Sequence, residues 1–243
     1  MILSPDSSEA MPAPDLRLER RAQRRGAAIV AGVDEVGRGP LAGPVVVAAV
    51  ILNRRKIPEG IRDSKQLTAN MRATIYEALL ASGASISVVA APPALIAEIN
   101  ILQASLWAMT QAVTALPVQP DHLLIDGNIV PHGLPCVGEA VVGGDALSLS
   151  IAAASIVAKV TRDRMCAIMH CEEPHYGFEG HKGYSAAVHF RALEQHGPGR
   201  YHRMDFAPCI EAEARLRTGI AVGPLLPKGW TRTIQPQLEL FAA

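Results

Sequence analysis

Residues 27–52 read AAIVAGVDEVGRGPLAGPVVVAAVIL, and this stretch decides the fold. Two short apolar runs, residues 27–36 and 45–52, have the length and composition of buried β-strands. The segment between them, GRGPLAGP, is a loop because it holds three glycines and two prolines. The first run ends in two acids, Asp34 and Glu35. Such an ending costs free energy unless something pairs with the carboxylates.

The bulk composition is that of an ordinary globular protein. The chain has 243 residues, of which 49% are hydrophobic, and its formal net charge is +0. A neutral chain offers no global electrostatic case for nucleic-acid binding, so any such case rests on local patches. The four cysteines form no C-x-x-C pair, and no secretory signal or membrane-length apolar run is visible. We therefore expect a cytoplasmic protein with reduced thiols and no membrane association.

The rest of the chain predicts an α/β fold. Thr68 is placed to cap a helix, and three early strands lie close enough in sequence to form a meander. The fourth strand follows a long helix, so it can pair parallel beside the first. The sequence thus predicts one mixed five-stranded sheet flanked by helices, with further helices near the C-terminus. Beyond the first two strands, the expected elements are strands 84–91, 122–126 and 137–142, and helices 69–82, 94–116, 146–171, 185–196 and 208–218.

Three regions follow from composition. Residues 1–26 contain LRLERRAQRRG, which predicts a disordered basic arm. The alternative for this arm is a weak, salt-sensitive contact with phosphates. Residues 27–218 form the folded domain. Residues 219–243 are rich in glycine and proline at first and are expected to be a flexible tail.

Four acids stand at element ends next to glycine: Asp34, Glu35, Asp126 and Asp145. If the strands that end at Asp34 and Asp126 are parallel neighbours, both acids lie at the carboxyl edge, where open α/β sheets bind ligands. Glu35 joins them only if the strand bends, which Gly37 allows. Taken alone, Asp145 has an alternative reading as a helix N-cap and Asp126 as a turn residue.

Clustered carboxylates repel one another, and hard divalent cations such as Mg²⁺ or Mn²⁺ relieve that repulsion. Two such ions about 4 Å apart can activate a water and stabilise the leaving oxygen of a phosphodiester. The residues alone therefore indicate a metal-dependent phosphoryl-transfer site.

The sequence also resembles a known family over roughly residues 27–216. The motifs that carry the resemblance are VDEVGRGPLAGPVVVAAV, the Asp63-Ser64-Lys65 triplet, LLIDGN, GDALSLSIAAASIVAKVTRDR, HKGY and YHRMDF. In this order they are similar to the motifs of ribonuclease HII, the type 2 ribonuclease H. One departure concerns Gly143, where the family often has a lysine. This departure puts in doubt a positive charge near Asp145.

The resemblance implies a ribonuclease H-like fold and a metal-dependent endonuclease. Its substrates would be RNA–DNA hybrids and duplex DNA with single embedded ribonucleotides, and its products would carry 3′-hydroxyl and 5′-phosphate ends. The family's catalytic and metal-binding acids fall on Asp34, Glu35, Asp126 and Asp145. The loop that senses the ribose 2′-hydroxyl falls on Gly37, Arg38 and Gly39.

Further positions concern the nucleic acid. Tyr184 matches a tyrosine that packs under the nucleotide at the RNA-to-DNA junction. Lys65, Lys159 and Arg162 are candidate phosphate contacts, with solvated surface charges as the alternative. Small glycines let backbone groups reach a 2′-hydroxyl, the group that distinguishes RNA from DNA. An adjacent arginine can clamp a phosphate.

The C-terminal tail holds a further motif. Gln237-Leu238-Glu239-Leu240-Phe241 resembles the pentapeptide with which bacterial proteins bind the sliding clamp. Gln237 would offer its amide, while Leu238, Leu240 and Phe241 would fill apolar pockets. The alternative is a segment that packs on its own domain.

The leading hypothesis is therefore a monomeric two-metal ribonuclease HII. A second hypothesis is a clamp-tethered nucleic-acid-binding module without catalysis, for which metal would not matter. A third, a nucleotide-binding protein with a glycine-rich loop, is weak because GRGPLAGP lacks the G-x-x-x-x-G-K-[ST] pattern.

Overall fold

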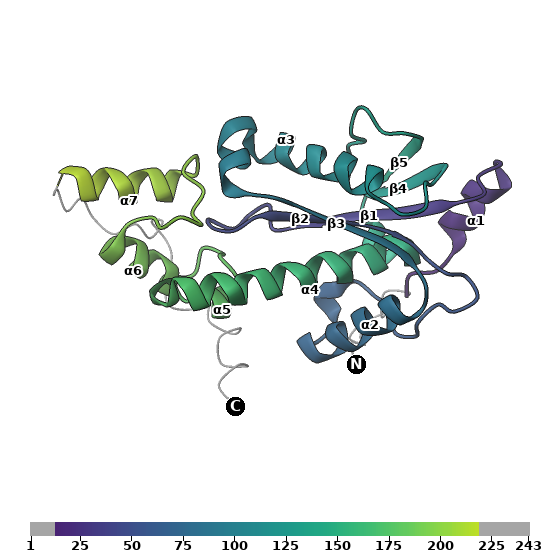
Figure 1. The fold of residues 1–243 in the computed structure, drawn as a ribbon, viewed down its shortest axis with the longest axis horizontal. Coiled ribbons are helices and arrows are strands. Elements are labelled where there is room, and N and C mark those ends of the chain that lie inside the picture. The colour runs from purple at the N-terminus through teal and green to yellow at the C-terminus, as the bar shows by residue number, and fades with distance from the viewer. Residues whose placement is uncertain (1–12, 219–243) are drawn as a thin grey trace, which may run out of the picture. The chain divides into compact units, whose positions relative to one another are not determined.

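The computed structural model of the protein describes residues 13–218 (Figure 1). Residues 1–12 and the tail from 219 to 243, including the clamp-type peptide, lie outside the described residues. The elements in chain order are α1 (Arg17–Arg24), β1 (Val30–Val36), β2 (Val45–Ile51), η1 (Ser64–Gln66), α2 (Ala69–Ala81), β3 (Ser85–Ala91), α3 (Pro93–Thr114), β4 (His122–Asp126), β5 (Val137–Val141), η2 (Gly144–Ala146), α4 (Leu149–Glu172), η3 (Pro174–Tyr176), α5 (Phe178–His181), α6 (Ala187–His196) and α7 (Ala207–Thr218).

The five strands form one sheet in the order β3-β2-β1-β4-β5. β1 pairs parallel with β4, and β4 pairs parallel with β5. The predicted mixed five-stranded sheet is confirmed, as is the expected place of the fourth strand beside the first. Thr68 caps α2 as predicted, because its side chain accepts a hydrogen bond from the Met71 backbone N–H.

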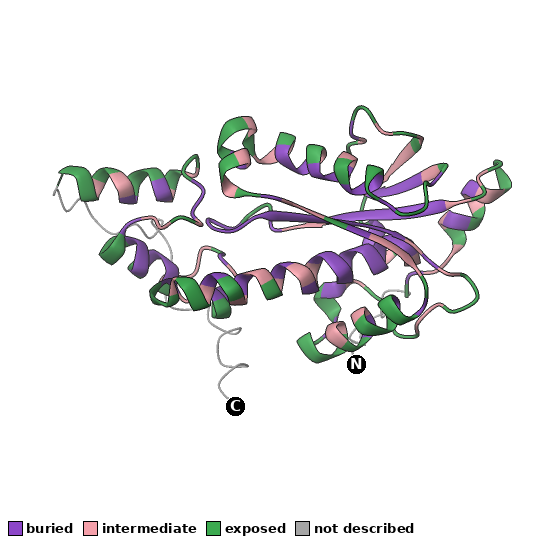
Figure 2. Ribbon diagram, in the orientation of Figure 1, coloured by how far each residue is buried: buried purple, intermediate pink, exposed green. Residues whose placement is uncertain are grey.

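The chain divides into two compact units. The first comprises the residues up to Asp34, Ala48–Val88 and Met109–Val157, and the second comprises Glu35–Val47, Val89–Ala108 and the residues from Ala158 onward. In the first unit, the start of α4 is buried on all sides (Figure 2). A Cβ added at Gly32 of β1 would lie 2.1 Å from the carbonyl carbon of Ser150. Only glycine permits this approach, so β1 and the start of α4 pack backbone to backbone at this point.

The prediction of a disordered arm over residues 1–26 was wrong for its second half. Residues Arg17–Arg24 form helix α1. Ala22 belongs to a buried cluster with Val30, Leu124, Val141 and Ile151, and Leu18 packs against that cluster. An arginine-rich helix is stable here because a narrow face contacts the hydrophobic core while the arginines reach solvent.

The second unit has its own cores. Leu41 packs with Phe190, Leu193, Cys209 and Ala212. A second cluster gathers Ala42 with aromatic and aliphatic side chains, which are Cys166, Met169, Tyr176, Phe178 and Ala192. The loop between β1 and β2 is thereby anchored by its middle residues, because Leu41 and Ala42 are buried in separate clusters.

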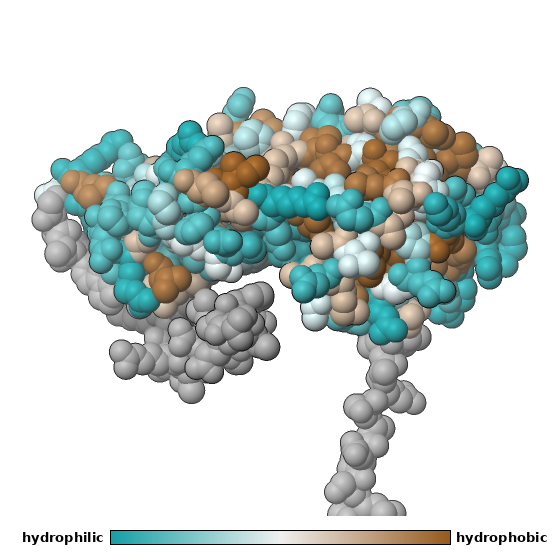
Figure 3. Space-filling model, turned by 60° about the horizontal axis from the view of Figure 1, so that its bottom comes forward, coloured by the Kyte–Doolittle hydropathy of each residue, from teal (hydrophilic) through white to brown (hydrophobic). Residues whose placement is uncertain are grey.

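No helix within residues 13–218 is long and apolar enough to span a bilayer. In the face drawn in Figure 3, hydrophobic residues lie among polar ones. Met71 and Leu80 of α2 are examples of exposed hydrophobic side chains.

Buried histidines form a hydrogen-bonded relay in the second unit. The Gly199 N–H donates to Nδ1 of His202 at 2.9 Å, and Nε2 of His202 lies 2.9 Å from Nε2 of His189. His189 Nδ1 lies 2.8 Å from the Tyr184 carbonyl oxygen, which can only accept. All three contacts are satisfied when both rings are neutral and His202 donates to His189. Burial lowers the pKa of His189 to about 3 and that of His202 to about 4.

This relay predicts acid-sensitive stability. Both histidines have folded-state pKa values below the ordinary histidine value of 6.5, so the unfolded chain binds more protons at mildly acidic pH. The full contribution is present above pH 6.5 and is lost as the pH falls toward about 4, with a slope of up to about 1.4 kcal/mol per pH unit for each histidine. Urea unfolding at about pH 8, 6 and 5 measures this slope. His189→Gln should flatten it, whereas the exposed His132→Gln should not. Equal slopes in both variants would contradict the assignment.

Candidate active site

Two of the predicted acids lie on neighbouring parallel strands: Asp126 ends β4, and Asp34 lies two residues before the end of β1. Val33 of β1 is in register with Ile125 of β4, and Asp34 and Asp126 are the next residues on each strand. Both therefore lie at the carboxyl edge of the sheet, as predicted. Asp34 is only 5% exposed, so its carboxylate is largely removed from water. Burying a charged carboxylate costs free energy that polar partners or a cation must offset. This edge of the sheet is therefore a candidate cation site.

The third acid, Asp145, reaches the same unit on a tight turn. The Gly144 N–H donates to Oδ1 of Asp126 at 2.7 Å. A Cβ at Gly144 would lie 2.5 Å from Cδ1 of Ile151 and 3.3 Å from that same Oδ1, so a larger residue would force the Ile151 side chain to move. Asp145 lies in η2, whereas α4 begins at Leu149 and Ser148 accepts from the Ile151 N–H. The expectation that Asp145 starts the long helix was thus wrong by one turn, and the N-cap reading for it does not hold.

Lys65 supplies the positive charge next to Asp145. Its Nζ lies 2.9 Å from Oδ2 of Asp145 and 3.7 Å from Oδ1 of Asp63. Burial alone lowers the pKa of Lys65, but the hydrogen bond and charge of Asp145, with the charges of Asp63 and Asp34, outweigh burial and raise it to about 12. Gly143 stands where the family often has a lysine, yet a cation is present at Asp145 from another segment of the chain.

The pKa of Asp126 responds to the neighbouring charges of the acid cluster. Burial raises the pKa of Asp126 above its usual value, and the negative charge of Asp145 adds to this rise. The N–H of Gly144 and the charge of Lys65 oppose it. Asp34, Asp126 and Asp145 are therefore electrostatically coupled, directly or through Lys65, and a bound cation would lower the free energy of their charged forms.

The donor set fits a hard divalent ion, since it consists of carboxylate oxygens without cysteine or histidine. Within residues 13–218, no group of three or more His, Cys, Asp or Glu side chains forms a ready-made metal cage. Mg²⁺ commonly keeps several waters and takes substrate phosphates as ligands beside one or two carboxylates. The residues that would hold it are Asp34 of β1, Asp126 at the end of β4 and Asp145 of η2.

Glu35 belongs to the second unit, directly after Asp34 in the chain. Its Oε1 lies 3.5 Å from Nη1 of Arg38, three residues on. Arg38 is half exposed, so solvent screens this ion pair and leaves it weak. The guanidinium can therefore exchange Glu35 for another anion, such as a phosphate, at small cost.

Two fully buried arginines shape the loop from Gly37 to Pro44. Arg203 donates to the carbonyl oxygens of Gly37, Arg38 and Gly43, and Arg162 donates to those of Ala42, Pro44 and Lys182. The prediction that Arg162 contacts phosphate was wrong, because its guanidinium is buried and points at backbone carbonyls of its own unit. Charge-assisted bonds to backbone oxygens compensate its burial.

Gly37 is confined by this frame. Its φ is +95°, and an added Cβ would lie 2.2 Å from Nε of Arg162. A side chain there would be strained and would collide with the arginine, so glycine is required on both counts. The steric limit at Gly37 and the bonds from Arg203 to the carbonyls of Gly37 and Arg38 thus constrain the backbone of the predicted 2′-hydroxyl loop.

Tyr184 lies beside this loop. A Cβ placed on Gly39 would come within 3.9 Å of Cε1 of Tyr184, and the guanidinium carbon of Arg162 lies 5.7 Å from the ring centroid. The ring is 43% exposed. The second unit therefore brings together three predicted substrate-binding residues, Gly37, Gly39 and Tyr184, and leaves an aromatic face accessible to a stacking partner.

Comparison with known proteins assigns the family. The sequence profile described as Ribonuclease HII matches residues 31–209. The chain belongs to the ribonuclease HII family. It is therefore a ribonuclease H, a hydrolase with endonuclease activity on RNA–DNA hybrids.

The relatives cover most of the chain. A ribonuclease HII from Rhizobium etli is 52% identical over 214 residues, covering 86% of this chain and 93% of that protein. The crystal structure of a ribonuclease H2 from Pyrococcus horikoshii is similar with a TM-score of 0.69 and 28% identity, covering 78% of this chain and 99% of that one. A ribonuclease HII from Archaeoglobus fulgidus, solved in complex with PCNA, is similar in fold, with a TM-score of 0.58, 24% identity and coverage of 72% and 92%. The ribonuclease H-like fold is confirmed.

Sequence reasoning missed two buried charged residues. Arg203 lies within the YHRMDF motif, yet nothing in that motif shows that its guanidinium binds three carbonyl groups more than 150 positions away. Glu19 lies in the segment that was expected to be disordered, and it is 3% exposed. The only sequence signal for Glu19 is a single acid among arginines.

Replacing Arg203 should weaken the fold. Arg203→Met leaves the buried carbonyls of Gly37, Arg38 and Gly43 without their donor, so we expect the free energy of unfolding to fall by about 3 kcal/mol or more. Urea unfolding at neutral pH measures this difference. Arg191→Met, which removes an exposed arginine of α6, is the matched control and should change stability by less than about 0.5 kcal/mol. Equal stability of the two variants would contradict the framing role of Arg203.

Proposed function

We propose that this ribonuclease H incises duplex DNA on the 5′ side of single embedded ribonucleotides as well as cutting longer RNA–DNA hybrids. The observation that carries the chemistry is the convergence of Asp34 and Asp126 on adjacent parallel strands with Asp145 bonded through its turn to Asp126. The observation that favours the single-ribonucleotide substrate is the rigid loop at Gly37–Gly39. A preformed loop can bind the 2′-hydroxyl of a single ribose and does not need several consecutive ribonucleotides.

Asp34, Glu35, Asp126 and Asp145 would hold Mg²⁺ or Mn²⁺ in this proposal. When bound, such ions activate a water and stabilise charge on the leaving oxygen. The acids would position the ions. The burial of Asp34 and Asp145 lowers the local dielectric constant, which strengthens electrostatic interactions with the scissile phosphate. Lys65 neutralises Asp145 while no ion is present, and its exposed ammonium can turn to a phosphate once Asp145 takes another cation.

The end groups follow from hydrolysis at the phosphorus atom. A water oxygen forms the new bond to phosphorus while the bond from phosphorus to the 3′ oxygen breaks, and that oxygen leaves with a proton. The products carry a 3′-hydroxyl and a 5′-phosphate. Backbone groups of Gly37 and Gly39 would bind the 2′-hydroxyl, Arg38 would bind the adjacent phosphate, and the Tyr184 ring would stack under the junction nucleotide.

The acid cluster can be tested directly. In Asp34→Asn the site loses one negative charge and one metal ligand. Incision of a duplex with one ribonucleotide should therefore fall by more than the ten- to hundredfold typical for loss of an outer-sphere partner. The measurement is cleavage in Mg²⁺ and in Mn²⁺, resolved on a denaturing gel that also reports the cut position and end groups.

The control for this test is Glu211→Gln, which removes an acid of α7 that pairs with Arg215. It should cut at the wild-type rate. Full activity of Asp34→Asn, or wild-type cutting of hybrids without incision at single ribonucleotides, would overturn the proposal.

We also infer that the tail binds a sliding clamp. Gln237, Leu238, Leu240 and Phe241 have the amide and apolar groups that suit a short extended anchor. The Archaeoglobus fulgidus relative was solved with PCNA, which supports a partner interaction of this kind.

Deleting residues 237–241 should abolish binding to the clamp of the same bacterium, because the anchor is lost. Cleavage of short oligonucleotide duplexes should stay unchanged, since the catalytic residues lie elsewhere in the chain. Surface plasmon resonance with immobilised clamp measures the binding. Undiminished clamp affinity after the deletion would refute this role of the tail.

A further inference from the structure

Helix α1 carries a buried acid for which the proposed function gives no role. Glu19 is 3% exposed, in a helix whose other charged residues include Arg17, Arg20, Arg21 and Arg24. Burying a carboxylate costs several kcal/mol unless polar groups bind it. Its contacts therefore show what this residue does.

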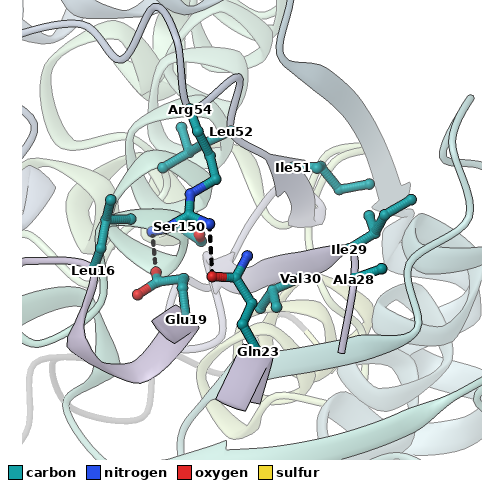
Figure 4. Close-up of a pocket in the computed structure, with 10 residues that line it drawn as sticks. All are labelled: Leu16, Glu19, Gln23, Ala28, Ile29, Val30, Ile51, Leu52, Arg54 and Ser150. Atoms are coloured by element: carbon teal, nitrogen blue, oxygen red, sulfur yellow. Dashed lines mark hydrogen bonds between the residues drawn. The ribbon is translucent and has the colours of Figure 1, made fainter. Parts of the chain in front are cut away.

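Glu19 binds the first turn of α4. Its Oε1 accepts from Oγ of Ser148 at 2.6 Å and from the Ser150 N–H at 2.9 Å, and Figure 4 shows the carboxylate reaching Ser150. Oγ of Ser148 in turn accepts from the Ile151 N–H at 3.2 Å. Two of the backbone N–H groups that a helix leaves unpaired at its start are thus satisfied, and the negative charge lies at the positive end of the helix dipole.

The segment before α1 reinforces this contact through its backbone. The Asp15 N–H donates to the Leu147 carbonyl at 3.3 Å, and the Leu149 N–H donates to the Asp15 carbonyl at 3.1 Å. These bonds form a parallel bridge between Asp15 and Ser148. Residues 147–150 are consequently held by α1 and its leading residue through side-chain and backbone bonds together.

The held segment is continuous with the turn that carries Asp145. The Ser148 N–H donates to the Gly144 carbonyl at 2.8 Å, and the Gly144 N–H donates to Asp126. The turn is therefore fixed at one end by β4 and at the other by α1. Without the α1 contacts, the position of the Asp145 carboxylate would be set by the bond between Gly144 and Asp126, by the turn's own bonds and by the bond from Lys65, whose side chain is 79% exposed.

We propose that Glu19 is a positioning residue for Asp145: by capping α4 together with Ser148, it fixes the turn of residues 143–148 and so the metal-binding position of Asp145. This inference rests on the proposed function, which makes Asp145 a metal ligand. It gives the arginine-rich N-terminal helix a part in catalysis without contact to substrate.

The chain offers graded variants. In Glu19→Gln, an amide oxygen can still accept from Ser148 and Ser150, and the amide nitrogen takes the place of Oε2, which has no hydrogen-bond partner within the described residues. Glu19→Ala removes both bonds. Leu18→Ala is the control, because Leu18 packs α1 on the core cluster and makes none of the capping bonds described above.

The test measures Mn²⁺ binding by calorimetry, and incision of a single-ribonucleotide duplex as kcat and KM. For Glu19→Ala we expect about tenfold weaker Mn²⁺ binding and an about tenfold lower kcat, with KM for the duplex within about twofold of wild type. Glu19→Gln should restore most of both values. Leu18→Ala should bind Mn²⁺ as wild type does, even where it lowers the melting temperature as much as Glu19→Ala.

The outcomes separate the two claims. Wild-type Mn²⁺ affinity and kcat in Glu19→Ala would overturn the positioning role alone, as would equal losses in Leu18→Ala or no recovery in Glu19→Gln. A wild-type protein that neither binds Mn²⁺ nor cuts the duplex would overturn the proposed function, and the positioning role would fall with it.

Discussion

The hydrogen bond from the Gly144 amide to the Asp126 carboxylate is the contact on which the acid cluster depends. It joins the end of β4 to the turn before α4, and a Cβ at Gly144 would lie 2.5 Å from Cδ1 of Ile151 and 3.3 Å from Oδ1 of Asp126. Asp34 needs no such bond, since the parallel register of β1 and β4 already places it beside Asp126. The sheet register thus places Asp34 and Asp126 at one edge, and the tight turn places Asp145.

Such a cluster stores electrostatic repulsion. Asp34 and Asp145 are buried, and burial and the charge of Asp145 raise the pKa of Asp126. Lys65, on an exposed side chain, bonds Asp145. Repulsion between neighbouring carboxylates raises the free energy of their charged forms, and divalent cations relieve this repulsion. In the second unit, Arg203 donates to the backbone carbonyls of Gly37 and Arg38, and Arg162 donates to those of Ala42 and Pro44 farther along the same loop. Chemistry and sugar recognition therefore have separate structural supports.

The sequence predicted what depends on local patterns. Alternating glycine, proline and apolar runs placed all five strands, and Asp126 at the end of its strand pointed to the carboxyl edge. The sequence did not predict interactions that depend on distant segments. These are the burial of Arg162, the pairing of Lys65 with Asp145 and the packing of helix α1. A charged residue normally reaches solvent, so arginine-rich segments look exposed unless the carbonyl or helix end that binds them is known. Asp145 was assigned to a helix start because the short turn η2 has no sequence signal apart from its glycines.

The central claim is that Asp34, Asp126 and Asp145 bind the catalytic ions. The most direct measurement is anomalous diffraction at the manganese edge from crystals of the protein grown with Mn²⁺ and an uncleavable hybrid. The account predicts anomalous density in contact with Asp34, Asp126 and Asp145, with the Lys65 ammonium displaced from Asp145. Saturating Mn²⁺ with no density at these carboxylates, and Lys65 still bonded to Asp145, would contradict it.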